Sequence, residues 1–288
     1  MRSAVRWAAG VAALGLVLAP VARAALYSER LFHYPRPRAQ WPAELPPAQA
    51  AHFTTSDGLG LSGWFVPPRN GATVVLVHGL GQGRQGLLPE ARVLLEAGYG
   101  VLLFDLRAHG ESAGEATTWG NEERRDVEAA LAWVRAQPQV DPARVGGLGF
   151  SIGASALADV AARDAGLGAV ALVSPYTLLS DEVDFDCGHR DPLSRLGMRL
   201  PFWRRHIDLA AVRTVDALHA LAPRPVWLVV GALERDTEMN AALLAAAPSG
   251  ASWRVPGAGH GHLVEAAPAE YPRRLRAFFD AALQPHHP

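Results

Sequence analysis

The sequence predicts an α/β fold: a mostly parallel central sheet with helices on both faces and a short cap-like insertion. Continuous apolar runs indicate strands that are buried on both sides, at residues 74–77, 101–104, 169–173 and 226–230. Helical patterns lie between these runs, and such alternation produces right-handed crossovers in a parallel sheet. Residues 177–222 lack a buried-strand run, so they are expected to form the insertion.

The N-terminus has the pattern of an export signal. Arg2 and Arg6 precede an uncharged apolar run over residues 8–22, and Ala22-Arg23-Ala24 fits the small-x-small pattern of a signal-peptidase site. Residues 1–24 are expected to be a signal peptide or an uncleaved signal anchor, with the arginines in the cytoplasm and the domain exported or anchored on the other side. A buried N-terminal helix is the alternative interpretation.

Residues 25–50 are expected to be a tether. Five prolines within YPRPRAQWPAELPPAQ favour an extended conformation over packed structure. The folded domain is expected over residues 51–288. It begins with a predicted hairpin over residues 52–67, because two strand-like runs flank Asp57-Gly58.

Helix signals follow the strands in order. Pro89 favours the start of one helix and Gly98 its end. Asn121 is expected to cap the next helix, which ends before Pro138. An apolar stripe over residues 275–282 indicates a C-terminal helix.

Composition indicates one large folded domain and argues against nucleic-acid binding. The chain has 288 residues, 49% of them hydrophobic, which is enough for one large domain with a proper core. The net charge is −1 and no long block of like charge occurs, so nucleic acid is not an expected partner. Cys187 is the single cysteine, which rules out an internal disulfide.

A serine stands at a predicted strand-to-helix corner. In GLGFSIGAS, Ser151 lies between Gly149 and Gly153, where an apolar stretch ends and a helical pattern begins. Glycines at these positions let strand and helix approach closely around a strained residue, which lifts the hydroxyl clear of the backbone. The structural alternative is an ordinary helix cap, a position that serine favours.

Other reactive residue types follow the predicted strands. His78-Gly79 ends one strand, an acidic loop with Glu234 and Asp236 ends a later one, and His260 and His262 follow the last. In open α/β sheets, ligands bind beyond the carboxyl ends of the strands. The insertion is therefore expected to act as a lid, with surface decoration as the alternative.

This constellation resembles the α/β-hydrolase family over roughly residues 52–284. The resemblance rests on Gly149-x-Ser151-x-Gly153 as a nucleophile elbow, on His78-Gly79 in the oxyanion loop, on the Asp105…Gly110…Ser112 turn, and on Gly257-x-Gly259-His260 before the last helix. The chain order Ser, acid, His also matches. An apolar N-terminal segment followed by a tether is similar to exported or membrane-anchored members.

The resemblance implies a role for each residue. Ser151 is the nucleophile, and His260 is the base that it needs; His262 is the competing histidine. The backbone N–H groups of Leu80 and Ile152 are the expected oxyanion-hole donors. His78, like Asp105 and His109, is expected to shape loops rather than take part in chemistry.

The acid departs from the usual family pattern. Aspartate commonly stands where this chain has Glu234, and Asp236 follows two residues later. Glutamate also serves as the acid in this fold, so Glu234 is preferred and Asp236 is kept as the alternative.

The sequence therefore predicts a serine hydrolase that cleaves a carboxylic ester, or a thioester or amide, through an acyl-enzyme, with no cofactor or metal. A catalytically silent binding or scaffold protein is the alternative. Residues 184–189 mix metal-ligand types without a zinc spacing and are expected to be a loop. The stretch 198–206 combines apolar and basic residues suited to a membrane surface or an acyl pocket, although packing on the core is the simpler account.

Overall fold

The computed structural model describes residues 2–186, 191–234, 237–248 and 252–284. An eight-stranded sheet with the strand order β1-β2-β4-β3-β5-β6-β7-β8 forms its centre. The strands are β1 Gln49–Thr54, β2 Gly60–Val66, β3 Thr73–Val77, β4 Gly100–Phe104, β5 Val145–Phe150, β6 Ala169–Val173, β7 Val226–Gly231 and β8 Ser252–Val255. β1 and β2 form the predicted hairpin, β2 pairs antiparallel with β4, and every other pairing is parallel.

Helices cover both faces of the sheet, which explains why the central strands are apolar throughout. Val75 and Val77 of β3 face one hydrophobic core, while Val74 and Leu76 face the other. The first face carries α3 Glu123–Arg135, α4 Ile152–Arg163 and α7 Thr214–Leu221; the second carries α2 Leu88–Glu96 and α10 Glu270–Ala282. The predicted fold class is confirmed.

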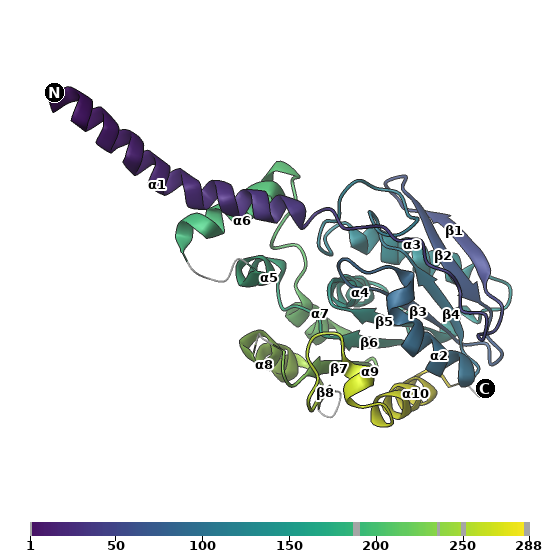
Figure 1. Cartoon of the computed structure of the whole chain (residues 1–288). Coiled ribbons are helices and arrows are strands. Elements are labelled where there is room, and N and C mark those ends of the chain that lie inside the picture. The colour runs from purple at the N-terminus through teal and green to yellow at the C-terminus, as the bar shows by residue number, and fades with distance from the viewer. Residues whose placement is uncertain (1, 187–190, 235–236, 249–251, 285–288) are drawn as a thin grey trace.

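Three helices lie between β6 and β7 in the part of this segment that the structure describes. They are α5 Leu179–Asp186, α6 Pro192–Arg204 and α7. The long N-terminal helix α1, Arg2–Arg30, projects from the body of the molecule, and its second half lies beside α6 (Figure 1). The remaining helices are α8 Thr237–Ala246 and α9 Leu263–Ala266, with short 3₁₀ turns at Arg84–Leu87 and Pro142–Arg144.

The proline-rich segment differs from the expected tether because it is packed against the domain. Phe32 is fully buried and its carbonyl accepts from the N–H of Thr117. The guanidinium of Arg36 donates to the carbonyls of Ala108 and Gly114, both at 2.8 Å. Prolines keep this stretch free of helix and strand, but its aromatic and basic side chains find partners on the domain. The folded unit therefore begins well before residue 51.

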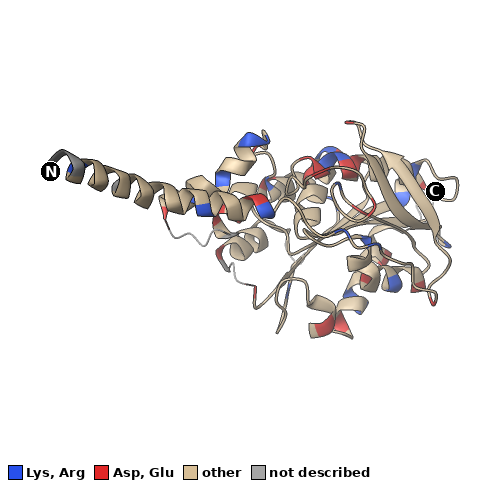
Figure 2. Ribbon diagram, turned by 45° about the horizontal axis from the view of Figure 1, so that its top comes forward, with Lys and Arg blue, Asp and Glu red and all other residues tan. Residues whose placement is uncertain are grey.

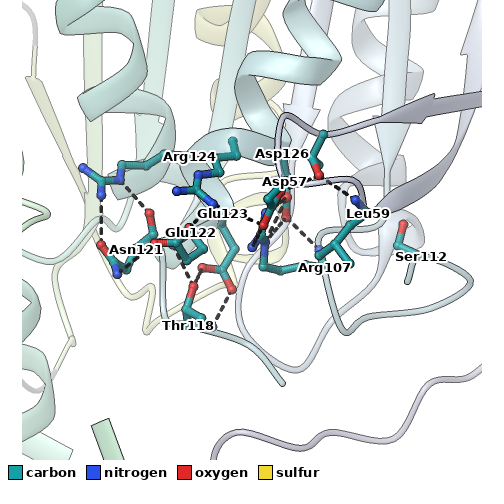
Figure 3. A network of polar contacts seen from close by, with 12 residues as sticks. Asp57, Leu59, Arg107, Ser112, Thr118, Asn121, Glu122, Glu123, Arg124 and Asp126 are labelled. Atoms are coloured by element: carbon teal, nitrogen blue, oxygen red, sulfur yellow. Dashed lines mark hydrogen bonds and ion pairs between the residues drawn. The ribbon is translucent and has the colours of Figure 1, made fainter. Parts of the chain in front are cut away.

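The expected Asn121 cap is wrong. α3 starts one residue later than a cap at this position requires, with Glu122 as the preceding residue and no capping side chain. Glu123, in the first helical turn, accepts instead from the Oγ1 atoms of Thr117 and Thr118 and from the N–H of Gly120 (Figure 3). The carboxylate satisfies the donors of the preceding loop, so the helix start does not need the asparagine.

Arg107 ties the hairpin turn to α3. Its guanidinium donates to both carboxylate oxygens of Asp126 and also reaches Asp57 in the turn after β1 (Figure 3). Arg107 and Asp126 are both buried, and this forked geometry suits a buried arginine–carboxylate pair. The pair fixes the loop after β4 against α3.

Candidate active site

The predicted reactive residues meet at the carboxyl edge of the sheet. Ser151 follows β5, Glu234 follows β7 and His260 follows β8, and parallel strands place these three ends along one edge. All three side chains line a cavity of about 500 Å³. Its wall also includes Ser174, Tyr176, Phe185, Leu233, Met239 and Asn240. Glu182 lines it as well, so the cavity combines several hydroxyls, one imidazole and two carboxylates with apolar side chains.

Ser151 stands at a strained corner. Its φ of 54° and ψ of −124° lie where non-glycine residues are uncommon, which costs about 1–3 kcal/mol. The corner is tight, since a Cβ at Gly149 would lie 2.5 Å from the Cα of Ala154 and one at Gly153 would lie 2.5 Å from the Val77 carbonyl oxygen. The Ser151 side chain makes no capping hydrogen bond to α4. Its hydroxyl is therefore not used as the helix cap of the structural alternative.

Glu234 is held firmly behind the histidine. One carboxylate oxygen accepts from the Ser174 hydroxyl at 2.5 Å and from the Gly231 N–H at 2.7 Å. The other oxygen lies 3.8 Å from Nδ1 of His260, which is the distance of an ion pair and longer than a direct hydrogen bond. Burial opposes ionisation, but His260, Ser174 and Gly231 outweigh it and lower the pKa of Glu234. Asp236, the alternative acid, lies outside the described residues.

His260 presents one ring nitrogen to the acid. Its ring packs on Phe150 with centroids 4.9 Å apart, and half of the side chain is exposed. Because Nδ1 faces Glu234, Nε2 is the nitrogen left for a nucleophile. The competing His262 immediately precedes α9 and is not among the cavity-lining residues.

The loop after β3 lies against the nucleophile. A Cβ on Gly79 would lie 3.1 Å from the Cβ of Ser151, so the backbone here passes close to the serine. Leu80 follows Gly79 in this loop, and Ile152 is the first residue of α4. Within the described residues, neither of these two backbone N–H groups has a hydrogen-bond partner. Two unused donors beside a serine are what an oxyanion hole requires.

His78 shapes this loop from within. Its Nε2 accepts from the N–H of Leu106 at 3.0 Å, so the proton lies on Nδ1, which donates to the Gly79 carbonyl at 2.8 Å. Burial, together with neighbouring His109, lowers the pKa of His78 to about 3, which keeps the ring neutral. The ring is neutral, fully buried and makes two hydrogen bonds, so it holds the loop in shape, as expected.

Asp105 also has a structural environment. Its carboxylate accepts from the Arg84 backbone and guanidinium and from the N–H of Glu111. These bonds brace the turn after β4, which agrees with the role expected for the residue.

Two residues whose side chains contact the Glu234 carboxylate were not predicted from the sequence. Ser174, at φ 49° directly after β6, orients Glu234, and Asn240 of α8 brings its amide within 3.4 Å of the same carboxylate. A polar residue at a strand end was the available signal for Ser174. Of the expected loop at 184–189, the first three residues belong to α5, and Cys187, Gly188 and His189 lie outside the described residues.

The chain is similar to several known proteins. The profile of the X-Pro dipeptidyl-peptidase (S15) family matches residues 24–190. The uncharacterised protein Rv2307c of Mycobacterium tuberculosis is 33% identical over 157 residues, covering 53% of this chain and 55% of that protein. The uncharacterised protein YfhR of Escherichia coli K12 is 32% identical over 153 residues, covering 50% and 53%. The chain thus spans about half the length of these curated relatives.

A solved structure with the same architecture is the esterase Pf2001 of Pyrococcus furiosus. It is 25% identical, with a TM-score of 0.71, over 88% of this chain and 99% of the esterase. The thiohydrolase aneE of Aspergillus aculeatus is 36% identical over 110 residues, which is 36% of this chain and 35% of that protein.

Proposed function

The chain belongs to the X-Pro dipeptidyl-peptidase (S15) family and is a serine hydrolase of the α/β-hydrolase type, and from this premise we propose that it cleaves a carboxylic ester with Ser151, His260 and Glu234. The observation that carries the proposal is the placement of Glu234. It is fixed by Ser174, faces Nδ1 of His260, and shares one cavity with the strained serine. An acid in this position keeps the imidazole in the tautomer that can accept a proton at Nε2.

The proposed reaction has two stages. The Ser151 hydroxyl attacks the ester carbonyl while Nε2 of His260 takes its proton, and Glu234 stabilises the resulting imidazolium. The N–H groups of Leu80 and Ile152 bind the oxyanion. His260 then returns the proton to the departing alcohol, which leaves an acyl-enzyme. Water activated by the same histidine hydrolyses this ester and restores the free serine.

The cavity wall favours an acyl or aryl group over an anionic one, because two carboxylates, Glu182 and Glu234, lie beside its apolar side chains. Tyr176, Phe185, Leu233 and Met239 contribute apolar surface next to the serine. The similarity to an esterase and to a thiohydrolase supports the same direction, although a thioester or a peptide would use the same residues. We propose an exported or anchored location on the basis of the apolar N-terminal helix.

Labelling with a fluorophosphonate followed by peptide mapping tests the nucleophile. Wild type is expected to carry the label on Ser151, and Ser151→Ala to carry none. Ser180→Ala is the control, because Ser180 lies outside the cavity and should leave labelling unchanged. A panel of esters, thioesters and X-Pro peptides then ranks substrates by kcat/KM. Folded wild type without a label would refute the proposed chemistry.

A further inference from the structure

The C-terminal part of α1 packs against α6, one of the helices between β6 and β7. Gly197 of α6 lies so close to α1 that a Cβ there would overlap the Val21 carbonyl and lie 2.7 Å from the Ala24 Cβ. The Ser28 hydroxyl donates to the Met198 carbonyl at 2.8 Å, and both groups are buried. Small residues and a satisfied buried hydroxyl let the two helix backbones approach closely.

The contact with α6 continues past the end of α1. Phe32 packs edge-on against Phe202 of α6 with centroids 4.7 Å apart, and the Arg205 guanidinium lies 4.2 Å from the Phe32 ring centroid. Arg205 also forms an ion pair with Glu29 of α1. The last turns of α1 are therefore part of the folded unit, and the small-x-small pattern at residues 22–24 falls inside this contact. Cleavage after Ala24 would remove the contacts of Val21 and Ala24 with Gly197.

The first half of α1 has the opposite character, because the residues whose burial is described between Val5 and Ala19, here called the bare stretch, are all exposed. From Trp7 to Ala22 the helix carries no charge, which is about 24 Å of helix at 1.5 Å per residue. Its large apolar side chains are exposed, among them Trp7 at 77% and Leu16 at 77%. Residues 5–30 are long and apolar enough to cross a membrane. Figure 2 shows this uncharged stretch projecting from the domain.

Basic and aromatic side chains gather where the bare stretch ends. The outward side of α6 exposes Arg195, Leu196, Trp203 and Arg204. On α1, Arg23, Tyr27 and Arg30 are exposed at the same end. Glu29 is already paired with Arg205, and the Asp191 carboxylate is used in capping α6. Aromatic rings with arginines are typical of the membrane interface, where anionic headgroups attract cationic groups.

We propose that α1 is retained and spans the bilayer, and that the outward side of α6 rests on a surface of anionic phospholipid headgroups. The short apolar stretch suits this arrangement, because Arg6 and Arg23 can extend their side chains to the two interfaces of a core about 30 Å thick. Two hydrogen bonds also connect the segment directly after α1 to the wall of the cavity. The Trp119 indole donates to the Leu31 carbonyl, and the Tyr176 hydroxyl donates to the Trp119 carbonyl. This proposal does not depend on the catalytic assignment.

Spin labels on the full-length chain in vesicles test the headgroup contact. Arg204→Cys and Arg273→Cys, each combined with Cys187→Ser, form a matched pair. Their side chains are 74% and 71% exposed, and each lies 3.9 Å from a glutamate. In phosphatidylcholine vesicles containing phosphatidylglycerol, the label at 204 is expected to be several-fold less accessible to a water-soluble nickel reagent than the label at 273. In phosphatidylcholine alone this protection should be weaker.

Equal accessibility at the two positions would overturn the proposal, and equal protection in both lipids would overturn the anionic preference. The mass of the protein purified from an exporting host tests retention: full length supports it, whereas a chain that begins at Ala25 overturns it. Gly197→Ala should loosen α6 and expose the label at 204. Gly15→Ala is its control, because no atom lies within 4 Å of a Cβ at that helical glycine.

Discussion

Glu234→Gln is expected to lower kcat by between about 10² and about 10⁴ through loss of charge and of the correct imidazole tautomer. The charge contribution follows from the 3.8 Å separation between the carboxylate and Nδ1 of His260. Two unit charges at that distance interact by about 1 kcal/mol in water and about 4 kcal/mol at an effective dielectric of 20. His260 is 51% exposed, so screening favours the lower part of this range, or about tenfold to a hundredfold in rate.

The tautomer contribution follows from the other carboxylate oxygen. Ser174 and Gly231 both donate to Oε1 of Glu234 and would hold the amide oxygen of a glutamine in that place. The amide NH₂ would then face Nδ1 of His260 and force it to accept. The proton would move to Nε2, where it blocks proton transfer from the nucleophile.

Steady-state hydrolysis of a chromogenic ester measures this effect. KM should change little, because the substitution acts through the histidine rather than on the substrate. Asp236→Asn is the matched control and should stay close to wild type. If Glu234→Gln keeps kcat within about threefold of wild type while Asp236→Asn loses the activity, Asp236 is the acid and the reasoning is wrong.

Substitutions at Ser174, Gly153 and Glu90 each probe one local feature of the fold. Ser174→Ala removes the 2.5 Å hydrogen bond to Glu234 and should lower kcat about tenfold to a hundredfold in the same ester assay; an unchanged kcat would show that the bond has no positioning role. Gly153→Ala places a Cβ against backbone carbonyls and should cost about 1–3 kcal/mol in urea unfolding, whereas Gly60→Ala, with open space around its Cβ, should be near neutral. Burial raises the pKa of Glu90 from 4.5 to about 7, so the folded state keeps a proton that the unfolded state has lost between these values. The contribution of Glu90 to stability should therefore be most favourable below pH 4.5 and decline by up to about 3 kcal/mol as the pH rises through 7, and Glu90→Gln should reduce the slope of stability against pH in this range relative to wild type; an unchanged slope would place its origin elsewhere, for example at Asp126, whose pKa burial also raises to about 7.

The strands were predictable because a strand that is buried on both faces has apolar residues at every position. Continuous apolar runs indicated β3, β4, β6 and β7, and the structure places each in the sheet. β5 was the difficult strand, since Gly146, Gly147 and Gly149 weaken its intrinsic preference. The structure gives the reason for these glycines: a Cβ at Gly147 would lie 2.8 Å from Leu157 of α4. Close helix packing outweighs local preference here.

The positions of the candidate site residues were predictable as far as they lie at strand ends. Ser151, Glu234 and His260 each follow a parallel strand, and topology alone brings such ends together. Ser174 and Asn240 were missed because their contribution is one contact each with Glu234. A single long-range hydrogen bond leaves no periodic pattern in the sequence.

The proline-rich segment shows where composition becomes ambiguous. Prolines restrict the unfolded chain, so they suit a free spacer and equally reduce the entropy lost when an extended strand docks on a surface. Composition therefore fits both states, and specific partners decide between them. Here a buried aromatic ring, Phe32, and a guanidinium, Arg36, that donates to three carbonyls supply enough contact to fix the segment. Those partners lie more than 70 residues away along the chain, which no local pattern reveals.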